Sequence, residues 1–235
     1  MHQRSLMHRT TKGLHSLRLV LLTNRLSNIL SFPAMAQEKY QQAKTLFESH
    51  LKSNPNHYKT IEYLGDIAGH EKDWDEAIKQ YSILKNQFPK TANYWYKYGG
   101  AMGMKAKSVN KFKALGMIDD IESSFLKAAE LDKKHIETRW ALVMLYIELP
   151  GIVGGSEKKA LKYSDELMDL SKVDGYLSKG YIDEYFNRYK KAEANYLKAH
   201  EIGNSKTTFQ KLYNLYLNKL KEPKKAQELK RKFEA

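Results

Sequence analysis

The sequence of 235 residues contains no cysteine. That absence excludes disulfide bonds, thiolate metal sites and cysteine nucleophiles together. It is compatible with an exported protein that avoids stray thiols. Proline and glycine are also scarce, at 5 and 13 residues, so few positions interrupt long helices.

Signature sequences of common catalytic sites are lacking as well. The chain has no G-x-S-x-G nucleophile elbow, no G-x-x-x-x-G-K-[ST] phosphate loop, no H-E-x-x-H zinc helix and no EF-hand loop. Its 8 histidines are scattered, and three of them lie in the first 37 residues. We therefore expect no enzymatic activity, no cofactor and no resident metal.

Acidic residues are absent from residues 1–37, which carry five basic residues between short apolar runs. No run reaches the ~18 apolar residues of a membrane span. The Ala-Met-Ala triplet at 34–36, before Gln37, is typical of a signal-peptide cleavage site. It predicts a leader at 1–37 and export to the periplasm or envelope. Because arginines such as Arg18 interrupt the apolar part, a mitochondrial transit peptide remains an alternative, as does a misassigned start in a cytoplasmic protein.

The formal net charge is +13, of which the first 37 residues contribute +5. The remaining excess of lysine is spread along predicted helices, as in "KEPKKAQELKRKF" near the C-terminus. A diffuse excess of this kind is typical of a solvated helix face, so we expect no nucleic-acid partner.

A spacing of 34 residues recurs after the leader. Small, aromatic and proline residues all repeat at this interval: Ala43 with Ala77, Phe47 with Tyr81, Pro55 with Pro89, and Ala192 with Ala226. Each repeat is predicted to be a helical hairpin. The small residue allows the two helices to approach, the aromatic fills the space beneath, and the proline ends the second helix.

This pattern resembles the tetratricopeptide repeat, and residues 58–91 carry it most fully. The resemblance implies an all-α fold, a right-handed α-solenoid of stacked antiparallel helix pairs. It covers residues 38–235 in about five to six repeats, with a lysine-rich last helix as the polar end cap. Insertions near 105–118 and 150–155 depart from the pattern. The segment "LPGIVGGSEKKAL" also resembles one found in exported bacterial tetratricopeptide proteins.

The same resemblance implies a non-catalytic scaffold or adaptor that binds a protein or peptide partner in a concave groove. The family's groove positions include Glu62, Asp66, Tyr96, Trp140, Met144, Tyr181 and Tyr185 of this sequence. Aromatic residues on a rigid concave surface suit peptide binding. Glu62 and Asp66 stand where carboxylate-clamping members of the family have Lys and Asn, so capture of a C-terminal carboxylate is not expected.

An alternative function is binding of a divalent cation. Glu62, Asp66 and His70 are spaced i, i+4, i+8 and therefore share one helical face. Two carboxylates and an imidazole could ligate a metal if a second element completed the site. The other interpretation is a polar stripe on the helix that lines the concave side.

The glycine-rich segment 150–156, "PGIVGGS", is the other candidate ligand site, because free N–H groups at a helix start can bind anions. Lys158 and Lys159 in the first turn oppose the helix dipole, however, and the glycine spacing is not that of a phosphate loop. The structural interpretation is a turn that Ser156 ends by starting the next helix. Two apolar residues of the turn, at 152 and 153, either pack on the body or stand out as a partner contact.

Overall fold

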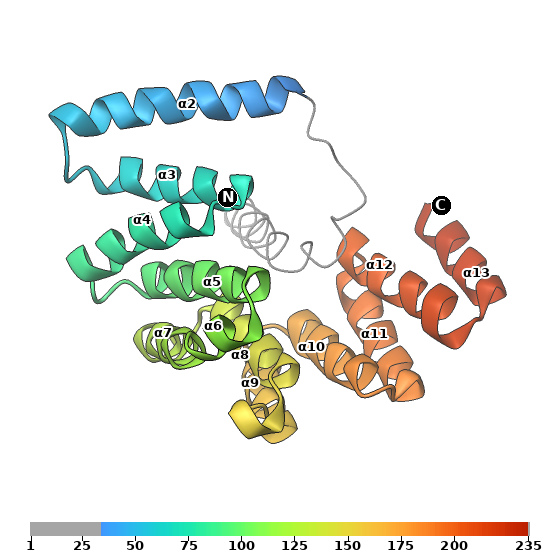
Figure 1. Ribbon diagram of the computed structural model, residues 1–235. Helices are drawn as coiled ribbons and strands as arrows, with labels where there is room; N and C mark the ends of the chain where they lie inside the picture. Colours follow the sequence, from blue (N-terminus) through green and yellow to red (C-terminus); the bar gives the residue numbers. More distant parts are fainter. Residues whose placement is uncertain (1–33, 235) are drawn as a thin grey trace, which may run out of the picture. The chain divides into compact units, whose positions relative to one another are not determined.

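The computed structural model describes residues 34–234 (Figure 1). The predicted leader lies almost wholly outside these residues, so its assignment stays a prediction. Within residues 34–234 the regular secondary structure is helical, and no strand occurs there. The expected all-α fold is confirmed. None of the described helices is both long and apolar enough to cross a membrane.

The described residues divide into two compact units, residues 34–137 and 138–234. The helices of the first unit are α2 (Ala34–Ser53), α3 (Tyr58–Glu71), α4 (Trp74–Gln87), α5 (Ala92–Ser108), α6 (Lys111–Leu115) and α7 (Ile118–Leu131). The second unit holds α8 (Ile136–Glu148, apart from its first two residues), α9 (Glu157–Leu170), α10 (Lys172–Tyr185), α11 (Tyr189–Gly203), α12 (Lys206–Leu215) and α13 (Pro223–Glu234). Within each unit, helices close in sequence pack together: α3 packs with α4, α10 packs with α11, and α5 packs with α7, past the short α6.

Small residues make this close packing possible. Three of the alanines that the 34-residue spacing singles out, Ala77, Ala192 and Ala226, are fully buried, whereas Ala43 of α2 is half-buried. Glycines on the first helix lie against an aromatic ring of the second: Gly65 on Tyr81, Gly99 on Phe125, and Gly180 on Tyr196. A methyl group at Gly65 would stand 2.7 Å from Tyr81 Cε1. Each ring therefore fills the space that the missing side chain leaves.

The α8–α9 pair departs from this arrangement. Four residues after the buried Ala160, at the position where α4 has Tyr81 and α11 has Tyr196, the sequence has Ser164. Its Oγ lies 2.6 Å from Oγ of Ser178 in α10, and both side chains are buried. Gly175 of α10 packs directly on the backbone of Met168 in α9. The linker between the two helices is a single residue, Ser171. Small residues thus bring these two helices into unusually close contact.

The C-terminal helix closes the second unit. Ala226 is its only buried residue among those described, and the remainder is rich in lysine. Phe233 stacks on Phe209 of α12 with ring centroids 4.5 Å apart. A helix with one buried stripe and a charged outer face is what a terminal cap of a helical stack needs.

Two segments interrupt the helix pairs at the positions where the sequence departs from the repeat. Between α5 and α7 the chain lengthens α5 to Ser108 and then forms the five-residue α6, which buries none of its residues. Between α8 and α9 it forms a short 3-10 helix, Gly151–Val153.

Candidate functional site

In the first unit the predicted residues Glu62 and Asp66 lie together on α3 and hold a lysine from the next pair. Lys97 Nζ is 2.9 Å from Glu62 Oε1 and 2.7 Å from Asp66 Oδ1. Lys59 adds a second ion pair to Glu62 at 3.2 Å. The hydroxyl of Tyr81 donates to Asp66 at 2.6 Å. The two carboxylates are therefore neutralised and hydrogen-bonded from within the protein.

Electrostatics follow from these contacts. Burial by itself would raise the pKa of Glu62, but the hydrogen bonds and charges of Lys97 and Lys59 outweigh it and hold that pKa below its ordinary value. Burial and the neighbouring Asp66 carboxylate raise the pKa of Tyr81 far above its ordinary value, which keeps the hydroxyl a donor. Both effects favour the ion pairs that the structure shows.

This arrangement opposes a divalent cation on α3. Lys97 supplies the positive charge that a metal would bring, and His70 stacks on Tyr40 with centroids 5.3 Å apart. No group of three or more His, Cys, Asp or Glu side chains in residues 34–234 is placed to hold a metal ion. The polar-stripe interpretation of this face agrees better with the geometry.

Tyr96 is the third predicted residue in this unit. Its side chain is buried, with the ring 5.1 Å from that of His135 and 6.2 Å from that of Phe125. It offers little surface to a partner in this conformation.

In the second unit, two of the four predicted residues are buried. Trp140 is 3% exposed, and its Nε1 donates to Asp174 Oδ1 at 2.8 Å, which joins α8 to α10. Met144 is buried one turn further along α8. These side chains support the face that α8 and α10 form, and little of them reaches solvent.

The other two predicted residues lie on α10 and remain accessible. Tyr181 is half-buried, and its hydroxyl donates to Glu148 at 3.1 Å. Burial and the Glu148 carboxylate raise the pKa of Tyr181 well above its ordinary value. Tyr185, one turn later, is 48% exposed.

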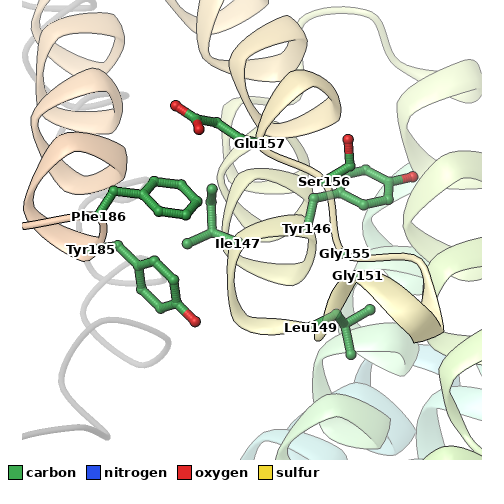
Figure 2. A pocket seen from close by; sticks show the side chains of 9 residues that line it. All are labelled: Tyr146, Ile147, Leu149, Gly151, Gly155, Ser156, Glu157, Tyr185 and Phe186. Carbon is green, nitrogen blue, oxygen red and sulfur yellow. The ribbon is translucent and has the colours of Figure 1, made fainter.

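A pocket of about 280 Å³ lies where the end of α10 meets the turn after α8 (Figure 2). Figure 2 shows the side chains of Tyr185 and Phe186 standing beside Ile147 of α8. The pocket is lined by Tyr146, Ile147, Leu149, Gly151, Gly155, Ser156, Glu157, Tyr185 and Phe186. Phe186 is 39% exposed, so both aromatic residues present part of their rings to solvent. Of the predicted groove residues, Tyr185 alone lines this pocket.

One arginine fixes the geometry of the pocket wall. Arg188 Nη2 pairs with Glu157 at 2.6 Å and its Nε with Asp183 at 2.7 Å. Its guanidinium also lies 4.9 Å from the centre of the Phe186 ring. Arg188 thereby ties the first turn of α9 to the end of α10 and holds Phe186 in place.

The glycine-rich segment is a hydrogen-bonded turn. The N–H groups of Gly155 and Ser156 donate to Pro150 O at 3.1 Å and Tyr146 O at 2.8 Å. Ser156 begins α9, as predicted, because its Oγ accepts from the N–H of Lys159 at 3.2 Å. The N–H groups of Gly155, Ser156 and Lys159 are therefore already hydrogen-bonded within the protein. The carboxylate of Glu157 lies in the first turn of α9, where it would repel an anion.

The two apolar residues of this turn differ in exposure. Ile152 is 94% exposed, whereas Val153 is half-buried. The sequence left open whether these residues pack on the body or project from it. Ile152 projects from the body into solvent.

The groove positions of the repeat identified Tyr185 but not Phe186, Tyr146 or Ile147. The adjacent aromatics "YF" at the end of a predicted helix were the available signal. Whether these two aromatics lie beside the turn after α8 depends on how the two helix pairs stack. Tyr146 and Phe186 are 40 residues apart in the sequence, so no local pattern predicts that they line one pocket.

Comparisons with known proteins bear on the fold. No protein-family model matches the sequence, and no curated protein matches it. Among solved structures, TTC0263, a thermophilic tetratricopeptide repeat protein of Thermus thermophilus, matches with a TM-score of 0.63 and 17% identity, over 78% of this chain and 94% of that one. A tetratricopeptide repeat protein from Parabacteroides merdae matches with a TM-score of 0.59 and 14% identity, over 84% of this chain and 73% of that one. At these identities the likeness concerns the fold alone.

Proposed function

We propose that this chain, which has the tetratricopeptide repeat fold, is a non-catalytic adaptor that binds a protein or peptide partner. The observation that carries the proposal is the pocket of the second unit, with its two part-exposed aromatic residues Tyr185 and Phe186. The wall opposite them comes from α8 and its turn. An apolar side chain of a partner would enter between these walls.

The size and lining of the pocket suit a side chain better than a free metabolite. A volume of about 280 Å³ is at the lower limit of pockets that enclose small-molecule ligands. Aromatic residues supply large contact areas at a low cost in conformational entropy, which is why they dominate binding hot spots. Arg188 adds rigidity, because it fixes the ring of Phe186 before a partner arrives.

The polar residues of the pocket are arranged for structure. Ser156 Oγ accepts a backbone N–H, and Glu157 is paired with Arg188. Neither is joined to a second group as a nucleophile is joined to its base. This supports an interaction site in preference to an active site.

The remaining groove positions would extend the contact. On α10, Tyr181 lies one turn before Tyr185 and is half-buried, so the two could form a continuous strip for a bound peptide. Glu62 and Asp66 would give the first unit a polar face whose charge is set by Lys97. The buried Tyr96, Trp140 and Met144 would act by supporting these faces.

The test is selection of peptides on the full chain from a displayed random-peptide library, followed by calorimetric titration of the enriched peptides. Tyr185→Ala with Phe186→Ala should weaken binding at least tenfold, since buried aromatic anchors typically contribute more than about 1.4 kcal/mol. Tyr63→Ala is the matched control, because Tyr63 is 50% exposed, belongs to the first unit and does not line the pocket. Enriched peptides that bind the double variant as tightly as the unaltered chain would overturn the assignment.

We also propose export, with the leader removed before Gln37. The Ala-Met-Ala triplet supports this cleavage site. Sequencing the N-terminus of the protein purified from its native cells tests it, since a mature chain that retains Met1 would contradict export by this route.

A further inference from the structure

The insertion between α5 and α7 presents an exposed apolar tip. Phe112 of α6 is 87% exposed and Leu115 is 47% exposed. Residues three apart lie on the same side of a helical turn, so the two side chains project together. An isolated exposed apolar residue is ordinary, but a phenylalanine and a leucine presented together on a helix that buries nothing call for an external contact.

Two lysines that have no ion pair among the described residues flank Phe112 at this tip, whereas Lys105 at the end of α5 pairs with Asp75. Residues 105–118 include four lysines and no acidic residue. Lys111 and Lys113, on either side of Phe112, are exposed and form no ion pair with any residue in the described part of the chain. The two aspartates at the start of α7 are not paired with them either. The tip therefore combines apolar and cationic groups on one small surface.

The fold holds the tip in shape without a partner. Asn110 begins α6 by accepting from the N–H of Lys113 at 3.0 Å. The N–H of Gly116 donates to Phe112 O at 3.3 Å, which ends the helix. Phe112 is thus presented by a closed turn of backbone, and little order has to be gained on contact.

We propose that this tip, residues 110–116, contacts an anionic lipid surface. Phe112 and Leu115 enter the interface between headgroups and acyl chains, while Lys111 and Lys113 meet the lipid phosphates. Apolar burial and attraction of lysines to anionic lipid act together in such contacts. This inference is independent of the partner pocket in the second unit.

A protein partner fits the tip less well. A stable protein interface covers about 800 Å² on each side and needs a complementary shape. The tip is built on a single helix of five residues that buries none of them. A lipid surface requires no matching shape, and reversible attachment needs only a few contacts. The charge favours anionic lipid over neutral lipid.

The absence of native cysteine makes the experiment direct. Phe112→Cys in the full chain gives a unique site for an environment-sensitive fluorophore, and Ile152→Cys gives a matched site, since Ile152 is 94% exposed in the other unit. Each labelled protein is titrated with vesicles of equal phosphatidylglycerol and phosphatidylcholine, and with phosphatidylcholine vesicles alone. We expect a blue shift and a rise in intensity at 112 with the anionic vesicles only, and neither change at 152.

Sedimentation with the same vesicles measures the contribution of the tip. Phe112→Ala, and separately Lys111→Gln with Lys113→Gln, should each lower the partition coefficient about tenfold. Ile152→Ala, and Lys158→Gln with Lys172→Gln, are the controls and should leave it unchanged. The basic first 37 residues contribute equally to every variant, so only the difference between variants counts.

Unchanged partition in Phe112→Ala, or equal spectral changes at 112 and 152, would overturn the proposal. A parallel titration of the labelled proteins with soluble poly-glutamate tests whether the tip instead binds an acidic polypeptide. If it shifts the fluorescence at 112 while the anionic vesicles do not, the tip binds an acidic polypeptide and the membrane assignment is wrong.

Discussion

Gly180 of α10 lies directly against the ring of Tyr196 of α11, with no space for a methyl group between them. Tyr196 is fully buried, and its hydroxyl donates a 2.9 Å hydrogen bond to Glu184. Because the ring cannot move aside without losing that bond, we expect Gly180→Ala to lower the free energy of unfolding by about 1–3 kcal/mol. This loss would appear despite the helix preference of alanine over glycine. Urea unfolding followed by circular dichroism measures it.

Gly100 provides the matched control on α5. No atom of another helix lies within 4 Å of the place where a methyl group would stand. Gly100→Ala should therefore stabilise the protein by about 0.5–1 kcal/mol. Similar effects of both substitutions would show that helix preference, and not the contact with Tyr196, decides the outcome.

A second prediction concerns the turn after α8. A methyl group at Gly155 would overlap the carbonyl of Leu149, which is backbone and cannot rotate away. We expect Gly155→Ala to destabilise the protein by about 2–3 kcal/mol. Gly151→Ala meets no neighbour and should change stability by less than about 0.5 kcal/mol. Thermal unfolding of the two variants separates these cases, and equal melting temperatures would contradict the close approach.

A third prediction concerns the ion pairs of α3. Lys97→Met leaves Glu62 buried without its main partner, and we expect a loss of about 2 kcal/mol near neutral pH. The pKa of Glu62 is held below its ordinary 4.5 in the folded protein, so its stabilisation is present above about pH 4.5 and is lost as pH falls through the lower folded value. Without Lys97, burial would raise that pKa, and acid sensitivity would begin at higher pH. Melting temperatures from about pH 3 to pH 7 test this; parallel curves for the two proteins would contradict it.

A fourth prediction places a pH-sensitive contact at the C-terminal end. Burial lowers the pKa of His200 below its ordinary 6.5 despite the nearby Glu201. Its Nδ1 lies 3.0 Å from Thr208 Oγ1, and its ring packs near Phe209 and Phe233. The unfolded chain takes up the proton more readily, so stability is complete above about pH 6.5 and declines as pH falls.

His200→Gln should remove this part of the pH dependence. The readout is the difference in melting temperature between the unaltered chain and the variant, from about pH 5 to pH 8. Other histidines contribute equally to both proteins and cancel. A difference that stays constant with pH would exclude His200 as the titrating group.

The sequence predicted the fold well because the fold is repetitive. A small residue and an aromatic that recur every 34 positions specify one helix pair, and buried Ala77, Ala192 and Ala226 stand where that spacing placed them. The start of α9 after the glycine-rich turn was also predictable, because Oγ of Ser156 accepts from the N–H of Lys159, only three residues later.

The burial of each groove side chain could not be predicted from the repeat pattern. A groove position identifies a helix face, but neighbouring pairs decide how much of that face they cover. Trp140 is buried, and its N–H donates to Asp174 on α10 of the next pair. Lys97 reaches Glu62 and Asp66 across the boundary between two pairs, which no periodicity encodes. The pocket at Phe186 arises from the same stacking.

Three of the side-chain links between neighbouring pairs cover nearly one repeat of chain. Lys97 and Glu62 are 35 residues apart, Trp140 and Asp174 are 34, and Arg188 and Glu157 are 31. The contact order of each unit is therefore low. Forming any one of these links costs only the conformational entropy of closing a loop of about one repeat. Each helix pair can dock as soon as its predecessor has formed. Folding can then keep pace with synthesis of the chain, in roughly the microsecond to millisecond range of helical proteins.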